Sequence, residues 1–138
     1  MDKPPLLLLI DDDLDDQMLF QDAIREINPL IEVQTAVNGV DALKALSANA
    51  ISPDYIFVDL NMPLMNGIQC LQEIKKLPNQ AHIPVIIYST SSYERDIPQT
   101  INNGAFYYIV KPFSFQELCE KLKKVISMKV EPGGQMGN

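Results

Sequence analysis

The sequence contains little cysteine, histidine or positive charge, and it has no long apolar run. Its 138 residues include 2 cysteines and 1 histidine, and 18 acidic against 11 basic residues give a net charge of −7. So few basic residues argue against direct DNA binding, because affinity for nucleic acids depends largely on neutralising phosphates. The aliphatic run Leu6–Ile10 is far too short to span a membrane, and no signal-peptide pattern surrounds it.

The two cysteines, Cys70 and Cys119, both fall in amphipathic helical patterns. We therefore expect reduced, structural thiols and a cytoplasmic protein. The length predicts a single domain with a substantial core, over residues 1–128. Residues 129–138 have no apolar period, so we expect a disordered C-terminal tail there.

Apolar strands and amphipathic helices alternate five times along the chain. The predicted strands are 6–10, 31–36, 54–59, 84–88 and 106–110, and the predicted helices are 14–27, 39–48, 67–76, 94–103 and 114–127. This alternation with short loops predicts an α/β fold, in which right-handed crossovers place helices on both faces of a parallel sheet. Pro98 falls in the fourth predicted helix, which should be short or kinked unless it begins near Asp96.

Polar residues follow four of the five predicted strands, and parallel strands bring such residues to one edge of the sheet. They are Asp11, Asp12 and Asp13, then Asp59, then Ser89 and Thr90, and finally Lys111. Asp59 ends the buried run 55–58 and precedes a turn that contains Pro63 and Gly67. Taken alone, it could be only a turn or capping residue.

The acidic segment 11–16 allows three interpretations. A helix start would account for Asp13, Asp15 and Asp16, because acidic residues complement the helix dipole. A calcium loop would use Asp11, Asp13 and Asp15, but its turn glycine is missing and a strand precedes it instead of a helix. The third interpretation is a magnesium site that the segment shares with Asp59.

Charge repulsion favours the magnesium site. Carboxylates that converge to 4–5 Å repel by about 4 kcal/mol per pair at an effective dielectric constant near 20. Lys111 alone cannot neutralise Asp11, Asp12 and Asp59, whereas a divalent cation can. Oxygen ligands without histidine or cysteine select magnesium-like ions.

With these residues in view, residues 5–127 resemble the receiver domain of two-component response regulators, in the CheY-like superfamily. The motifs that carry the resemblance are Ile10-Asp11-Asp12, Asn38-Gly39-x-x-Ala42-Leu43, Val58-Asp59-Leu60-Asn61-Met62-Pro63 with Gly67, Pro84-Val85-Ile86-Ile87-Tyr88-Ser89, Gly104-Ala105 and Val110-Lys111-Pro112-Phe113. Each motif is weak alone, but their order and their positions at strand ends make the combination specific. The resemblance implies a flavodoxin-like, doubly wound sheet of five parallel strands in the order 2-1-3-4-5, with five helices.

The resemblance also implies a role for each residue at the sheet edge. Asp59 would accept a phosphoryl group from a phosphohistidine on a sensor histidine kinase or a histidine phosphotransfer protein. Mg2+ would be held by Asp12, Asp59 and the backbone carbonyl of Asn61, with Asp11 acting through water. Ser89 would be the switch hydroxyl, Tyr108 the switch aromatic residue and Lys111 the ion-pair partner of the phosphoryl group.

Two further expectations concern the surroundings of these residues. The resemblance implies a cis bond between Lys111 and Pro112, which proline makes accessible. Thr90 stands where the family usually has a smaller residue, so access of the phosphodonor or the rate of phosphate hydrolysis is expected to differ.

The leading hypothesis is a stand-alone receiver, which promotes its own phosphorylation and dephosphorylation without being a dedicated enzyme. It would act on a downstream protein target, without DNA or membrane binding, as a monomer or a phosphorylation-dependent dimer. The alternative is a haloacid-dehalogenase-like phosphatase with Asp11 as nucleophile and Asp13 two residues later. Asp15 stands where that class has threonine or valine, and no cap segment is present. A degenerate, purely structural receiver is a third possibility, which the intact Asp12, Asp59 and Lys111 oppose.

Overall fold

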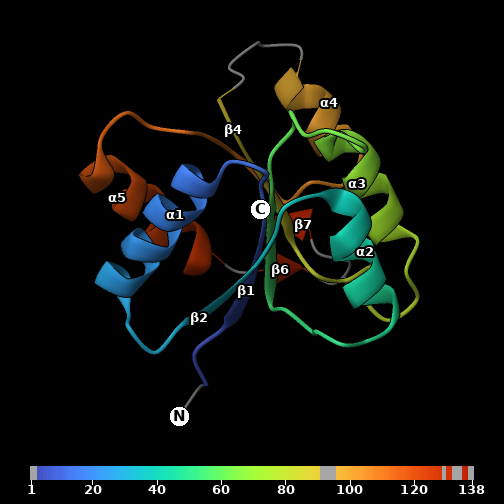
Figure 1. Cartoon of the computed structure of the whole chain (residues 1–138), viewed down its shortest axis with the longest axis horizontal. Coiled ribbons are helices and arrows are strands. Elements are labelled where there is room, and N and C mark those ends of the chain that lie inside the picture. The colour runs from blue at the N-terminus through green and yellow to red at the C-terminus, as the bar shows by residue number, and fades with distance from the viewer. Residues whose placement is uncertain (1–2, 91–95, 129, 132–134, 137–138) are drawn as a thin grey trace.

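The computed structural model describes residues 3–90, 96–128, 130–131 and 135–136. Strands and helices alternate as the sequence predicts (Figure 1). In chain order they are β1 (Leu6–Ile10), α1 (Leu14–Ile27), β2 (Glu32–Ala36), α2 (Gly39–Ser47), β3 (Tyr55–Val58), α3 (Gly67–Lys75), β4 (Val85–Ser89), α4 (Asp96–Asn102), β5 (Tyr107–Val110), α5 (Phe115–Ile126), β6 (Val130–Glu131) and β7 (Gln135–Met136).

The first five strands form one parallel sheet in the order β2-β1-β3-β4-β5, which confirms the predicted fold class. Helices α1 and α5 cover one face, while α2, α3 and α4 lie on the other (Figure 1). The chain moves outward from β1 to β2 and then crosses back to β3. The carboxyl ends of β1 and β3 therefore lie side by side at the point where the direction of winding reverses, which is where ligands bind in such sheets.

Alternate residues of the central strands enter two separate cores, because successive side chains of a strand point to opposite faces. On β1, Leu7 and Leu9 pack against α1 and α5, and Leu8 and Ile10 pack against α2 and α3. All four are at most 3% exposed, so β1 is buried on both faces. This explains why the central strands read as unbroken apolar runs in the sequence.

Side-chain caps determine where the helices begin. Asp13 caps α1, Asn38 caps α2 and Ser114 caps α5, each by accepting a hydrogen bond from a backbone N–H three residues later. Such caps satisfy N–H groups that have no partner within the helix. Within the described ranges, no helix is both long and apolar enough to cross a membrane.

Helix α4 begins at Asp96 and has 7 residues, so Pro98 is its third residue. The first turn is the place where a helix tolerates proline, because the N–H groups there have no helical acceptor. The described helix therefore corresponds to the exception in the sequence prediction, a start near Asp96 with Pro98 in the first turn, although 94–103 was the predicted range. Residues 94–95 of the predicted helix lie outside the described residues.

The tail differs from the expectation of disorder at four residues. Val130–Glu131 pairs with Gln135–Met136 as a two-stranded antiparallel ladder. The sequence pattern missed this pairing because strands of two residues are too short to have an apolar period.

The two thiols differ in burial, which predicts a difference in reactivity. Burial raises the pKa of Cys70 to about 12, whereas Cys119 on α5 is half-buried. Because the thiolate is the reactive form, iodoacetamide at pH 8 should modify Cys119 first and Cys70 only after unfolding in urea. Mass spectrometry of timed samples would measure both rates. Similar rates in the folded protein would contradict this packing, and Cys119→Ser, the control, should take up no label before unfolding.

Candidate functional site

The site lies where β1 and β3 end next to each other. Ile10 pairs with Val58, and the backbone N–H of Asp59 donates to the carbonyl of Ile10 at 3.1 Å. Asp11 and Asp12 follow β1 directly, and the N–H of Asp11 donates to Ala36 of β2 at 3.0 Å. Backbone hydrogen bonds between neighbouring strands thus continue past the strand ends, and they hold the main chain at Asp11 and at Asp59.

Three carboxylates converge at this edge. Oxygen atoms of Asp11, Asp12 and Asp59 all lie within 4.8 Å of one another. Asp11 is fully buried and Asp59 is 7% exposed, while Asp12 faces solvent. Two carboxylates of the cluster are buried, and the third is open to solvent. A hard divalent cation can therefore reach the cluster from solution.

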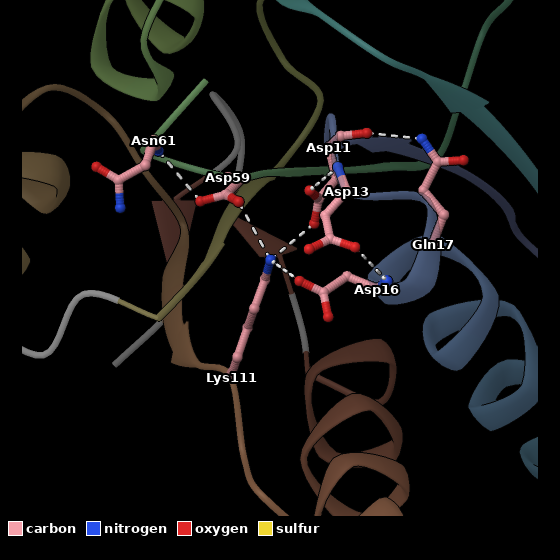
Figure 2. A network of polar contacts seen from close by, with 7 residues as sticks. All are labelled: Asp11, Asp13, Asp16, Gln17, Asp59, Asn61 and Lys111. Atoms are coloured by element: carbon pink, nitrogen blue, oxygen red, sulfur yellow. Dashed lines mark hydrogen bonds and ion pairs between the residues drawn. The ribbon is translucent and has the colours of Figure 1, made fainter. Parts of the chain in front are cut away.

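The ammonium of Lys111 compensates part of this charge. Its Nζ donates to Asp11 Oδ2 at 2.8 Å, to Asp59 Oδ2 at 3.1 Å and to Asp16 Oδ2 at 2.6 Å (Figure 2). The Lys111 side chain is only 8% exposed. One buried cation therefore joins the ends of β1, β3 and β5 to the first turn of α1.

Burial and ion pairing shift the pKa values of two of these groups. Burial raises the pKa of Asp11, although the hydrogen bonds from Lys111 and from the Asp13 N–H act in the opposite direction. Burial alone would lower the pKa of Lys111, but hydrogen bonds to Asp11 and Asp16 outweigh it, so that pKa is raised. Lys111 is therefore a permanent positive charge at neutral pH, and Asp11 is the anion that burial destabilises most directly.

Two further contacts position Asp59. Its Oδ1 accepts a hydrogen bond from the Asn61 N–H at 3.1 Å, and its Oδ2 faces Lys111 (Figure 2). Gly67, the first residue of α3, packs on its backbone, since a Cβ there would lie 2.5 Å from the Asp59 carbonyl oxygen. Both oxygens of the carboxylate and its main chain are thereby oriented by neighbours.

The Asp11 segment is held in a similar way. Asp11 Oδ1 accepts from the Asp13 N–H at 3.0 Å, and the Asp11 carbonyl accepts from Gln17 Nε2 at 2.6 Å. Gln17 is buried in α1. Helix α1 thus fixes the turn that carries Asp11 and Asp12.

The remaining predicted site residues lie on β4 and β5. Ser89 is the last residue of β4 and is fully buried, and its carbonyl accepts from the Lys111 N–H at 2.8 Å. Tyr108 is half-buried on β5 and packs against the core on the α2 and α3 face. Thr90, which follows Ser89, is exposed.

The expectation of a cis bond between Lys111 and Pro112 is wrong, because the described residues contain no cis peptide bond. A bond before proline can take either form, and a sequence motif does not determine which one is adopted. Lys111 reaches the carboxylates in this structure with a trans bond.

Three contacts at the site are absent from the sequence interpretation. Asp16 was assigned only to the helix start, yet it makes the shortest bond to Lys111. Gln17 and Tyr88 were not singled out, although the Tyr88 ring centre lies 5.1 Å from Lys111 Nζ. Only the charge excess around one lysine could have signalled Asp16, and it would not have distinguished Asp16 from Asp15.

Chemically, the site offers a carboxylate nucleophile, a fixed cation and two further carboxylates that can share a metal ion. Phosphoryl transfer needs mainly positioning and charge neutralisation, and these groups can supply both.

Comparison with known proteins identifies relatives with the same fold. The sequence model of the response regulator receiver domain matches residues 7–123. The transcriptional regulatory protein PrrA of Mycobacterium tuberculosis is 33% identical over 122 residues, which cover 88% of this chain and 50% of PrrA. The chain thus spans about half the length of this curated relative.

Two solved structures are similar over nearly the whole chain. The phosphorylated cyanobacterial phytochrome response regulator RcpA matches with a TM-score of 0.80 and 33% identity, over 88% of this chain and 91% of RcpA. The Mn2+-bound form of response regulator Rcp1 matches with a TM-score of 0.75 and 27% identity, over 90% of this chain and 93% of Rcp1.

The contact between Gly67 and the Asp59 backbone predicts the effect of Gly67→Ala. A Cβ at residue 67 would lie 2.5 Å from the Asp59 carbonyl oxygen and 2.7 Å from Leu60 Cα, so the backbone has to shift. We expect the free energy of unfolding to fall by about 2 kcal/mol, as measured by urea denaturation. Gly39→Ala is the control, because its nearest neighbour, 3.1 Å away, is the flexible side chain of Met65. Equal losses in both variants would show that the close approach at Gly67 does not matter.

Repulsion among the carboxylates predicts that Asp12→Ala leaves the metal-free fold intact. Asp12 is exposed, so removing its charge should change the free energy of unfolding by between 0 and about +1 kcal/mol. Thermal and urea unfolding with a chelator present would measure this. Asp13→Ala is a control of opposite sign, because it removes the cap of α1 and should destabilise by about 1 kcal/mol. Unfolding of the Asp12 variant would mean that Asp12 has a structural role.

Proposed function

Because the chain belongs to the response regulator receiver family of two-component systems, we propose that it is a phosphorylation switch with Asp59 as the phosphoacceptor. The burial and the neighbours of the Asp59 carboxylate are the main support for this proposal. Asp59 is 7% exposed, faces Lys111 at 3.1 Å and lies within 4.8 Å of Asp11 and Asp12.

In the proposed reaction, a carboxylate oxygen of Asp59 attacks the phosphorus of a phosphohistidine. The phosphorus–nitrogen bond breaks, a phosphorus–oxygen bond forms, and the imidazole leaves with the electron pair and takes up a proton. Asn61 orients one Asp59 oxygen and Lys111 the other, so the nucleophile is held before the donor arrives. Lys111 then offers positive charge to the new phosphoryl oxygens.

The residues present fit a Mg2+ ion. Asp12, Asp59 and the Asn61 carbonyl would hold it directly, and Asp11 would act through water. When bound, the ion neutralises charge that the single Lys111 leaves uncompensated. The relative Rcp1 has a Mn2+-bound form, which supports the binding of a divalent cation by this chain.

The output of the switch is proposed to run through Ser89 and Tyr108. Phosphate adds a charge of about −1.5 to −2 and strong acceptor oxygens at Asp59. Ser89 would respond as the switch hydroxyl, and Tyr108 lies on the adjacent strand, where Ile87 of β4 pairs with it. The change would then reach the surface formed by α4, β5 and α5, where a downstream protein binds.

The phosphodonor is proposed to be a sensor histidine kinase or a histidine phosphotransfer protein. Large apolar side chains are exposed on the segments that follow the strand ends around Asp59, and they could contact such a protein. They are Leu14, Met18, Leu64 and Phe113, with exposed fractions of 62%, 63%, 80% and 108%. Exposed apolar side chains next to a reactive group are typical of a protein-binding surface.

The phosphatase alternative fits the contacts less well. Asp11 is fully buried, and one of its oxygens faces Lys111 while the other accepts the Asp13 N–H. The Asp13 carboxylate caps α1 by accepting the Asp16 N–H at 3.1 Å. Because both carboxylates are engaged in these contacts, Asp11 is poorly placed to attack a substrate and Asp13 is poorly placed to protonate it.

We also propose how this receiver passes on its signal, in which oligomeric state and in which compartment. PrrA is a transcriptional regulator about twice as long as the matched segment, whereas we propose that this receiver acts on a protein in trans, without binding DNA. It would work as a monomer or a phosphorylation-dependent dimer in the cytoplasm, where its free thiols stay reduced.

The test is to locate the phosphate. Incubation with acetyl phosphate and Mg2+ should add one phosphoryl group at Asp59, which peptide mass spectrometry would identify after borohydride reduction. Asp59→Asn, Asp12→Ala or a chelator should each abolish the modification, because they remove the nucleophile or the cation. Phosphate on Asp11, or unchanged labelling of Asp59→Asn, would refute the receiver proposal and favour the phosphatase.

A further inference from the structure

We propose that Asp16 is a brake on phosphorylation, because it holds the Lys111 ammonium that the incoming phosphoryl group needs. The inference rests on the function proposed above and assigns a positioning role to a residue outside the expected site. Asp16 Oδ2 lies 2.6 Å from Lys111 Nζ, compared with 2.8 Å for Asp11 and 3.1 Å for Asp59.

The number of donors on Lys111 limits how many acceptors it can serve. An ammonium group has three N–H donors and no acceptor. In the structure, three carboxylates from three segments accept from Lys111, namely those of Asp11, Asp16 and Asp59 (Figure 2). A phosphoryl oxygen can therefore bond to Lys111 only after one of these three contacts is released.

Asp16 differs from the other two acceptors in its relation to the metal site. Asp11 and Asp59 belong to the group of carboxylates that can share a cation, and that group does not include Asp16. A cation bound there would weaken the attraction of Asp11 and Asp59 for Lys111, but it would leave Asp16 unchanged. Asp16 then becomes the main competitor of the phosphoryl group for the ammonium.

The position and charge of Asp16 determine the sign of its effect on phosphorylation. Asp16 extends from the first turn of α1 and is 27% exposed, whereas Lys111 is 8% exposed. Its negative charge repels an anionic phosphodonor and draws Lys111 toward α1. Lys111 keeps two other acceptors, Asp11 and Asp59, so it stays at the edge of the sheet when Asp16 is replaced. Removal of the Asp16 charge should therefore accelerate phosphorylation.

The experiment measures the second-order rate constant for phosphorylation of Asp59 by acetyl phosphate at saturating Mg2+. Asp16→Asn should raise this constant at least about threefold, since the contact is a partly exposed ion pair. Asp16→Glu keeps the charge and should restore the wild-type rate. Asp15→Asn is the matched control, because Asp15 is an exposed acid of the same helical turn that does not contact Lys111, and its effect should stay below about twofold.

A second measurement on the metal-free protein reports the contact itself. The 15N-detected ammonium signal of Lys111 should shift in Asp16→Asn and remain in place in Asp15→Asn. Equal rates for the two Asn variants, or slower phosphorylation of Asp16→Asn, would overturn the inference while Asp59 still becomes phosphorylated. Absence of phosphate on wild-type Asp59 would instead overturn the proposed function, and the brake with it.

Discussion

Compensation of buried negative charge at the sheet edge is the constraint on which the rest of the site depends. Asp11 is fully buried beside Lys111, and removing one partner of such a pair typically costs about 3–5 kcal/mol. The single ammonium meets three carboxylates, and a fourth, that of Asp12, lies close to two of them. The site thus keeps a local excess of negative charge, which Lys111 relieves only in part and which favours a cation.

The parallel sheet makes this arrangement possible. Lys111 is 100 residues from Asp11 and 52 from Asp59 in sequence, yet the strand ends bring their side chains within hydrogen-bonding distance. The reversal of winding places β1 and β3 next to each other, and Gly67 lies so close to the Asp59 backbone that a Cβ there would be 2.5 Å from the Asp59 carbonyl oxygen. The geometry of the site depends here on backbone packing as much as on the charged groups.

The two faces of the sheet carry different parts of the site. Helices α1 and α5 pack against each other on one face, and α1 supplies Asp16 and Gln17, which hold Lys111 and the Asp11 turn. The other face carries the short α4 and the half-buried Tyr108, which lie near the end of β4. The groups that hold Lys111 and the Asp11 turn therefore lie on one face of the sheet, and the short helix α4 lies on the other.

Local patterns in the sequence determined the order of elements, the parallel sheet and the convergence of Asp11, Asp12, Asp59 and Lys111. These features follow from apolar periodicity and from the common direction of the strands, so they can be predicted from the sequence alone. The tertiary structure alone decided that Asp16 and not Asp15 bonds to Lys111, because the choice depends on how α1 is rotated against the sheet. It also decided the trans form of the bond before Pro112 and the pairing of 130–131 with 135–136. Neighbouring residues of the same type, alternative isomers and very short strands look alike in a sequence, and only the packing of the whole chain distinguishes them.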